Sequence, residues 1–321
     1  MKLAILANEP YHNSFGLSLT LKELIDRVDK FISFNIGKEK LNEEIKDLKD
    51  FDCIITWFNP ILLEMDSISK LQIPLIMASC DMPKRFRDNL YKKIVEHQNP
   101  SGIIVENKCS IPAFKTYLEK EDLNFFWFPW GIDEEFVKDY NENKIYDVSQ
   151  TGQFNRYEFR REINFLLEGR NNLSYYRTSP ERGIEKKEKF TYDEYCKIIN
   201  RSKISIGGCL QNKEFISYNG TYIGNTFPKN FEIPGCKSVL FNTNWGDKDI
   251  LGFKNGENFV EFKNPRDCIR KIEYYIEQPE ELDKISRKGF ELVHKYHTNK
   301  IHVDNFIRSL EHSYNDGNTI S

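Results

Sequence analysis

The stretch Thr226–Asn242, TFPKNFEIPGCKSVLFN, predicts a short helix, a tight turn and a buried strand in direct succession. Gly235 ends the helix, and 238–241 is a mostly apolar segment of the kind that forms a strand inside a sheet. In open α/β folds, ligands bind at the carboxyl ends of the parallel strands, where helix N-termini offer N–H groups to anions. This unit therefore indicates an α/β fold with a ligand site beside it.

Two side chains of this stretch suit a nucleotide. Lys229 places a positive charge beside the predicted start of the helix, and Glu232 is the type of side chain that accepts hydrogen bonds from both hydroxyls of a ribose. The alternative is an ordinary surface helix on which both side chains are solvated, since a short motif by itself is weakly specific.

Length and composition indicate a globular protein of more than one domain. At 321 residues the chain is longer than one hydrophobic core usually supports, so two domains are expected. Hydrophobic residues make up 39% and aromatic residues 14%, far from the composition of a disordered chain. The 46 Lys and Arg residues nearly balance the 49 Asp and Glu residues, and the net charge of -3 gives no overall attraction to nucleic acid. We therefore expect no nucleic-acid partner.

The cysteines indicate a reducing compartment. The 7 cysteines are an odd number, include no C-x-x-C pair and lie mostly in apolar runs, so they are expected to be buried free thiols. The N-terminal apolar run is too short for the core of a signal peptide, and no segment approaches the roughly 18 apolar residues of a spanning helix. The sequence thus predicts a cytoplasmic protein without an integral membrane segment.

Predicted strands and helices alternate along both halves of the chain. In the first half, strands are expected at 3–6, 31–36, 53–57, 73–78, 102–105 and 125–130, with helices at 17–28 and 41–48. In the second half, strands are expected at 146–150, 203–207 and 258–262, with helices around 160–165 and at 190–200, 266–277, 279–296 and 299–313. This alternation favours parallel, doubly wound sheets.

A polar linker at 139–144 separates the two series. We expect a Rossmann-like N-terminal domain at 1–143 and a Rossmann-like C-terminal domain at 144–298, facing each other across a cleft. The last segment, 299–321, is expected to be a helix that packs back toward the N-terminal domain.

Polar residues that follow strands of the first half are the candidates for catalysis. His12 follows the first strand and Asp81 follows the strand at 73–78, so both are expected to line one cleft. A carboxylate such as Asp81 can act as a general base toward a hydroxyl. Its alternative role is to cap the helix that begins at Pro83, and the alternative for His12 is a solvated loop histidine.

The second half offers further candidates for binding an anion. Gly152 follows the strand at 146–150 and lets backbone N–H groups approach a phosphate, and the next helix carries Arg160. A polar loop that contains Tyr218 and Asn225 leads into the opening stretch.

Six segments, in this order, resemble the CgeB-like (spore maturation type) glycosyltransferases, which belong to the GT-B class of two Rossmann-like domains, near the glycosyltransferase group 1 families. They are FPWGID at 128–133, YDV at 146–148 with Gly152 and an arginine downstream, SKI at 202–204, KNFEIPG at 229–235, KNGE at 254–257, and YHT at 296–298. The resemblance covers 125–297 well and the first half loosely, where such enzymes hold their variable acceptor site.

The resemblance implies a UDP- or GDP-linked sugar donor bound mainly by the C-terminal domain. Glu232 would take the ribose hydroxyls, Gly152 and Gly235 would allow close backbone approach, and Lys229 would meet the diphosphate where the family often has Arg. Group 1 relatives often carry a second Glu about seven residues before the ribose one. Asn225 lies in that region here and would supply only neutral hydrogen bonds.

The implied reaction is hexosyl or related transfer to an acceptor glycan, protein or other small molecule, with no cofactor. The sequence shows no compact cluster of His, Cys and Asp ligands, so no metal is expected, and a basic side chain with backbone N–H groups would stabilise the departing diphosphate. If Asp81 deprotonates the acceptor, inversion is expected; if it caps a helix, retention is favoured. The alternatives are a sugar-nucleotide epimerase of the same fold and a non-catalytic nucleotide-sugar-binding protein.

Overall fold

The computed structural model describes residues 1–8, 17–57, 59–65, 68–78, 89–120, 123–152, 158–177, 191–207, 217–218, 221–222 and 226–315. Three of the predicted site residues, His12, Asp81 and Asn225, lie outside these ranges, and so does the side chain of Tyr218.

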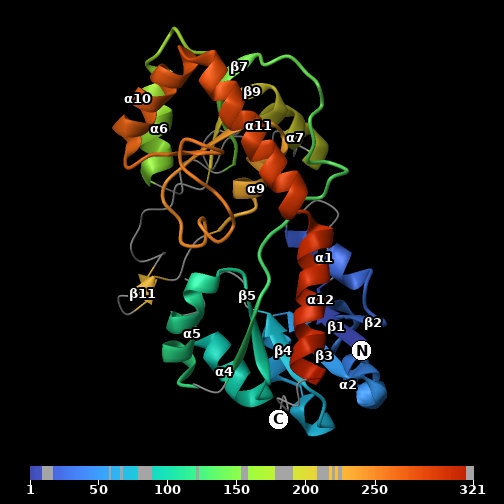
Figure 1. Cartoon of the computed structure of the whole chain (residues 1–321). Coiled ribbons are helices and arrows are strands. Elements are labelled where there is room, and N and C mark those ends of the chain that lie inside the picture. The colour runs from blue at the N-terminus through green and yellow to red at the C-terminus, as the bar shows by residue number, and fades with distance from the viewer. Residues whose placement is uncertain are drawn as a thin grey trace.

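The first half of the chain forms a six-stranded, fully parallel sheet in the order β2-β1-β3-β4-β5-β6 (Figure 1). Its strands are β1 Leu3–Ala7, β2 Lys30–Ser33, β3 Cys53–Trp57, β4 Leu75–Ala78, β5 Gly102–Val105 and β6 Asn124–Trp127. Its helices are α1 Leu17–Ile25, α2 Lys38–Lys46, α4 Leu90–Gln98 and α5 Ile111–Leu118, with short 3-10 segments η1 Phe34–Ile36, η2 Asp47–Asp50, η3 Pro60–Leu63, η4 Ile68–Leu71 and η5 Lys108–Ser110.

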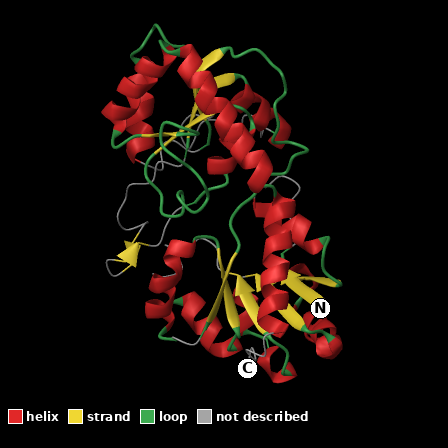
Figure 2. Cartoon of the chain, viewed as in Figure 1, coloured by secondary structure: helices red, strands yellow, loops and turns green. Residues whose placement is uncertain are grey.

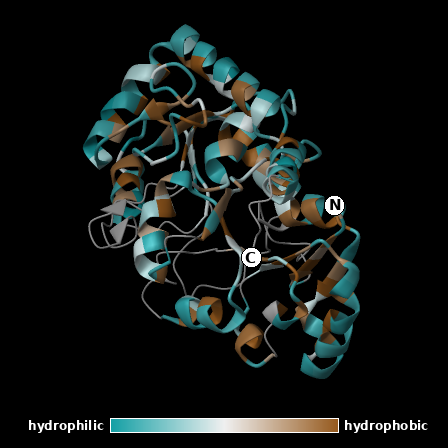
Figure 3. Ribbon diagram, turned by 60° about the horizontal axis from the view of Figure 1, so that its bottom comes forward, coloured by the Kyte–Doolittle hydropathy of each residue, from teal (hydrophilic) through white to brown (hydrophobic). Residues whose placement is uncertain are grey.

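The central strands of this sheet are buried on both faces. In β1, Leu3, Ile5 and Ala7 belong to one hydrophobic cluster, whereas Ala4 and Leu6 belong to the cluster on the other side. This division follows from the two-residue period of a strand, and burial of both faces is typical of a parallel sheet covered by helices. The apolar segments of the ribbon accordingly lie at the sheets and the inward sides of helices (Figure 3).

The second half forms a five-stranded parallel sheet in the order β13-β12-β9-β7-β8 (Figure 2). Its strands are β7 Tyr146–Gln150, β8 Tyr175–Arg177, β9 Ser202–Ile206, β12 Val239–Asn242 and β13 Val260–Glu261. Its helices are α6 Glu158–Glu168, α7 Tyr192–Asn200, α9 Lys229–Gly235, α10 Pro265–Ile276 and α11 Pro279–Tyr296. A small antiparallel pair, β10 Ser217–Tyr218 and β11 Thr221–Tyr222, lies apart from this sheet.

The chain crosses between the two halves twice, and the two crossings lie side by side. The Ile132 N–H donates to His297 O at 2.9 Å, and the Asn299 N–H donates to Ile132 O at 2.8 Å. A β-carbon on Gly131 would stand 2.7 Å from the backbone nitrogen of Asn299, so this approach requires a glycine. After the second crossing, α12 (Asn299–Asn315) packs on α1 and β6 of the first half, where Phe306 contacts Phe126 and Phe128 (Figure 1).

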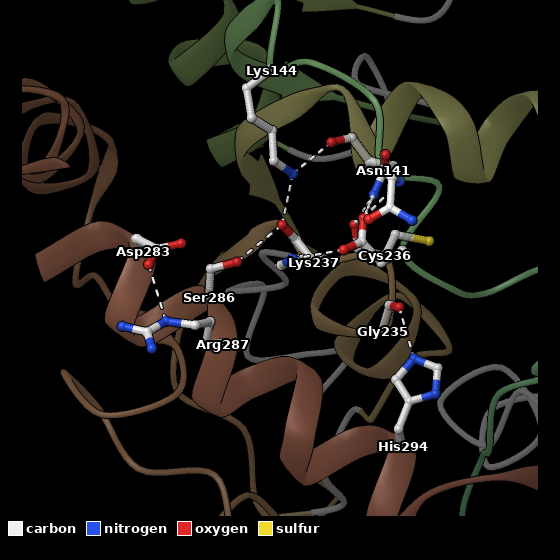
Figure 4. A network of polar contacts seen from close by, with 11 residues as sticks. Asn141, Lys144, Gly235, Cys236, Lys237, Asp283, Ser286, Arg287 and His294 are labelled. Atoms are coloured by element: carbon white, nitrogen blue, oxygen red, sulfur yellow. Dashed lines mark hydrogen bonds and ion pairs between the residues drawn. The ribbon is translucent and has the colours of Figure 1, made fainter. Parts of the chain in front are cut away.

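A polar network anchors the segment that enters the second sheet (Figure 4). Lys144 donates from Nζ to Asn200 O at 2.5 Å and to Lys237 O at 2.7 Å, and Ser286 Oγ donates to the same Lys237 carbonyl. Burial lowers the pKa of Lys144 to about 8, with nearby Asp139 acting in the opposite direction. These contacts hold residues 139–144 against the carboxyl ends of α7 and α9.

None of the helices in the described ranges has the length and apolar character needed to cross a membrane.

Candidate functional site

The turn after β7 and the first turn of α9 meet around Gly152. Gly152 has φ of 85°, a backbone conformation that favours glycine, and a β-carbon there would stand 2.9 Å from Lys229 Nζ. The preceding carbonyl, Thr151 O, accepts hydrogen bonds from both Lys229 Nζ and Arg160 Nη2. Two cationic side chains from different helices therefore converge on one glycine turn at the carboxyl end of a parallel strand, the usual position of an anion site in α/β proteins.

Glu232 follows Lys229 by three residues on α9, so the two side chains share a face of the helix. Its carboxylate is buried, at 2% exposure, and accepts hydrogen bonds from Tyr192 at 2.9 Å and from Tyr195 at 2.7 Å, one on each oxygen. Burial raises the pKa of Glu232, while the two tyrosine hydroxyls and Lys229 act in the opposite direction. The carboxylate is thus held by neutral donors beside a cation.

The two tyrosines come from the first turn of α7. A capping box sets the start of this helix: the Glu194 N–H donates to Thr191 Oγ1 at 3.2 Å, and the Thr191 N–H donates to Glu194 Oε2 at 2.7 Å. The cap places Tyr192 and Tyr195 on one side of the helix, with their rings stacked at 5.9 Å between centroids.

Gly235 stands at a closely packed position at the end of α9. A β-carbon on Gly235 would stand 2.5 Å from Val137 Cγ1 and 3.4 Å from Ile132 Cδ1 and Val293 Cγ1. His294 Nε2 lies 2.9 Å from Gly235 O (Figure 4). Protein atoms therefore fill the space beside this glycine, which permits close packing of α9 on α11 and on the segment that contains Val137.

Of the predicted donor-side residues, the structure brings Gly152, Arg160, Lys229 and Glu232 together. Tyr218 lies on β10, whose partner strand β11 contacts η5 and α5 of the first half. Gly235 lies at the far end of α9 from Lys229.

Three hydrogen bonds between side chains and backbone N–H groups join the loops that face each other from the two halves. Asp247, which follows β12, accepts hydrogen bonds from the backbone N–H groups of Lys108 at 2.5 Å and Cys109 at 2.9 Å. Asn107 Oδ1 accepts from the Thr226 N–H at 2.9 Å. The Asp247 side chain is 2% exposed, although Lys108 beside it is exposed to solvent.

A recess opens at the carboxyl ends of β3 to β6 of the first sheet. Its cavity volume is about 20 Å³, room for about one water molecule, and the recess continues into open solvent. It is lined by Thr20, Leu21, Trp57, Ala78, Ile104, Glu106, Phe128, Pro129 and Trp130. The indole N–H of Trp130 is buried and has no hydrogen-bond partner in the described part of the chain. The walls are thus mainly aromatic and aliphatic, with Glu106 and Thr20 as polar members.

No group of three or more His, Cys, Asp or Glu side chains is placed to hold a metal ion within the described ranges.

Several residues of the site carried no recognisable signal in the sequence. Tyr192 and Tyr195 look like ordinary amphipathic-helix residues, and only their spacing of three could have placed both on one face. Asp247 lies in a polar loop, and its partners are about 140 residues away in sequence.

Comparison with known proteins supports the fold and a family resemblance. Residues 154–308 match the family described as "Glycosyl transferase-like". No curated protein sequence matches the chain.

Solved structures match over nearly the whole length. HepE from Anabaena, crystallised with UDP, is 13% identical with a TM-score of 0.64, and the alignment covers 97% of this chain and 100% of HepE. Sucrose-phosphate synthase from Thermosynechococcus elongatus is 10% identical with a TM-score of 0.63, covering 99% and 100%. A glycosyltransferase from Rickettsia africae is 11% identical with a TM-score of 0.61, covering 100% of both chains. Together with the two parallel sheets, these likenesses confirm the predicted α/β fold of two Rossmann-like halves, the GT-B architecture.

Proposed function

We propose that this chain is a glycosyltransferase that moves a sugar from a UDP- or GDP-linked donor to an acceptor hydroxyl, with the donor bound by the second half. The observation that carries the proposal is the convergence of Lys229 and Arg160 on the turn at Gly152, with Glu232 one helical turn away. A nucleoside diphosphate has the same pattern of groups, an anionic diphosphate next to a diol. The family match and the UDP complexes of HepE agree with this assignment.

In this proposal, Lys229 and Arg160 stabilise the diphosphate as it leaves. In the described structure both side chains donate to the Thr151 carbonyl, so a phosphate oxygen at Gly152 would take over contacts that a neutral oxygen now makes. An anionic phosphate oxygen attracts these two cations more strongly than a neutral carbonyl oxygen does, so the exchange favours the ligand. Fixed positive charge where negative charge develops lowers the barrier to departure of the leaving group.

The acceptor is proposed to bind on the first half, at the recess beside Trp57 and Trp130. Its mostly apolar rim suits the carbon face of a sugar or another ring. Asp81 and His12 stay the proposed catalytic residues on that side. Assignment to the CgeB-like group, independence of metal ions and a cytoplasmic location are likewise proposals from the sequence.

A screen of nucleotide sugars tests the proposal. We expect one UDP- or GDP-linked sugar to raise the melting temperature of the wild type, because a ligand that binds only the native state stabilises it by mass action. Calorimetry with that sugar should show binding to the wild type and at least about tenfold weaker binding to Glu232→Ala, since hydrogen bonds to a charged group contribute about 1.5 to 3 kcal/mol. Binding of no nucleotide sugar would rule the proposal out. Turnover of the donor without any acceptor would instead indicate an epimerase.

A further inference from the structure

Beside the turn at Gly152, where Lys229 and Arg160 converge, two tyrosine hydroxyls contact the carboxylate of Glu232. Tyr192 and Tyr195 each donate to a different oxygen of the same carboxylate, at 2.9 and 2.7 Å. Their rings are stacked, with an interplanar angle of 13°, and the capping box at Thr191 and Glu194 fixes the helical turn that carries them. Two independent hydrogen bonds therefore determine the position and the rotation of the carboxyl plane.

The arrangement leaves acceptor capacity on the carboxylate. An ionised carboxylate has about four lone-pair sites, and the two tyrosines use one on each oxygen. Among the described residues these two hydrogen bonds leave one site on each oxygen, which is the number that a ribose diol requires. A glutamate side chain has three rotatable bonds, so without the tyrosines its carboxylate would have to be ordered by the ligand itself.

The two hydroxyls stay protonated over the working range of pH. Burial, followed by the negative charge of Glu232, raises the pKa of Tyr192 and of Tyr195 well above the usual value. They therefore act as donors wherever Glu232 is ionised.

We propose that Tyr192 and Tyr195 are positioning residues that orient the Glu232 carboxylate toward the ribose hydroxyls of the donor, and so determine discrimination between ribose and deoxyribose nucleotides. This inference rests on the proposed function. It differs from a purely structural role of the tyrosines, in which their hydroxyls would affect stability and leave the preference for a 2′-hydroxyl unchanged.

The test measures calorimetric dissociation constants of UDP, GDP and their 2′-deoxy forms. The variants are Tyr192→Phe and Tyr195→Phe, which keep the rings and hence the contact of Lys229 with the face of Tyr195, 5.8 Å from its centroid. Tyr140→Phe is the matched control, because the Tyr140 hydroxyl contacts Phe136 O and Asp193 in the same part of the molecule. Circular dichroism of each variant establishes that it is folded.

We expect the wild type to bind the ribonucleotide at least about tenfold more tightly than its 2′-deoxy form, as for a hydrogen bond to a charged group. In each tyrosine variant this ratio should fall about threefold or more, whereas Tyr140→Phe should keep it. An unchanged ratio in both folded tyrosine variants, or in the folded one if the other does not fold, would overturn the inference and leave the proposed function intact. Failure of the wild type to bind either UDP or GDP would overturn both.

Discussion

At the scale of single residues, Lys229 is predicted to recognise phosphate rather than the nucleoside. Lys229→Met should weaken binding of UDP or GDP about tenfold or more, because it removes a charge-assisted hydrogen bond, and should leave the weak binding of the free nucleoside unchanged. Calorimetry with both ligands measures the two effects. Lys203→Met is the control, since Lys203 of β9 forms an ion pair with Asp147 of β7 at 2.7 Å, away from the turn at Gly152. Equal loss for nucleoside and diphosphate would contradict the assignment.

A pair of buried histidines predicts loss of stability in mild acid. His297 Nε2 lies 2.8 Å from Leu251 O and its Nδ1 lies 3.2 Å from His302 Nε2, so both rings are held neutral in one hydrogen-bonded chain. Burial lowers the pKa of His297 to about 4, and burial together with His297 lowers that of His302 to about 3. Unfolded histidines take up protons below about pH 6.5, whereas the folded ones do not, so stability falls as the pH falls from about 6.5 toward 4.

Each histidine should account for about 2 kcal/mol of unfolding free energy lost between pH 7.5 and 5.0. Urea denaturation at the two pH values measures this loss. In His302→Gln, whose amide can still donate to His297, the loss should be smaller because one titrating group is gone. The same loss in wild type and variant would show that other groups are responsible.

At the scale of secondary-structure elements, Gly235 is predicted to be a packing residue of α9. Gly235→Ala should destabilise the protein by about 1 to 3 kcal/mol, because the added methyl group would overlap Val137. The double variant Val137→Ala, Gly235→Ala should recover part of that loss, and Gly169→Ala, whose nearest contact would be at 3.9 Å, should be neutral. The urea midpoints of these three variants and of the wild type measure the changes in stability. If Gly235→Ala keeps the stability of the wild type but binds the nucleotide more weakly, Gly235 belongs to the donor site instead.

Most helices and strands could be predicted, because the sequence patterns of buried strands and of helix ends agree with the elements in the structure. The predicted bounds of β3, β5, β7 and α11 agree with the structure: β3 follows Asp52, β5 is followed by Glu106, and α11 begins at Pro279. The aromatic segment at 125–130 was predicted too long: β6 ends at Trp127, since Pro129 cannot donate to the ladder. β2 ends at Ser33, whose hydroxyl accepts from the Asn35 N–H and starts a 3-10 turn. The three-residue edge strand β8 had no signal of its own.

The candidate site was predictable only in part. Gly152 and Lys229 stand in local motifs, a glycine after a strand and a lysine at a helix start, so the sequence could suggest them. Their proximity, and the role of Thr151 O between them, depends on the pairing of β7 with β9 and of β9 with β12, which brings together segments about 80 residues apart. Pairs such as Asp247 and Lys108 follow from how the two halves face each other, which no local pattern specifies.

At the scale of the whole molecule, Asp247 is predicted to hold the two halves in the described arrangement. Asp247→Ala leaves two backbone N–H groups of η5 without their acceptor and should increase the radius of gyration in solution, because buried donors without partners are costly and water can enter the junction. Small-angle X-ray scattering measures this change. Asp249→Ala, at an exposed carboxylate in the same loop, should scatter like the wild type. Identical curves for all three proteins would contradict a role of Asp247 in holding the halves together.

The central claim is that the diphosphate of a sugar donor binds at Gly152 between Lys229 and Arg160. The most direct test is a crystal structure of the wild type with the nucleotide that binds it best. We predict phosphate oxygens within hydrogen-bonding distance of Lys229 Nζ and the Gly152 N–H, with Lys229 released from Thr151 O and the ribose hydroxyls facing Glu232. A nucleotide bound elsewhere, with Lys229 and Arg160 still on the Thr151 carbonyl, would contradict it.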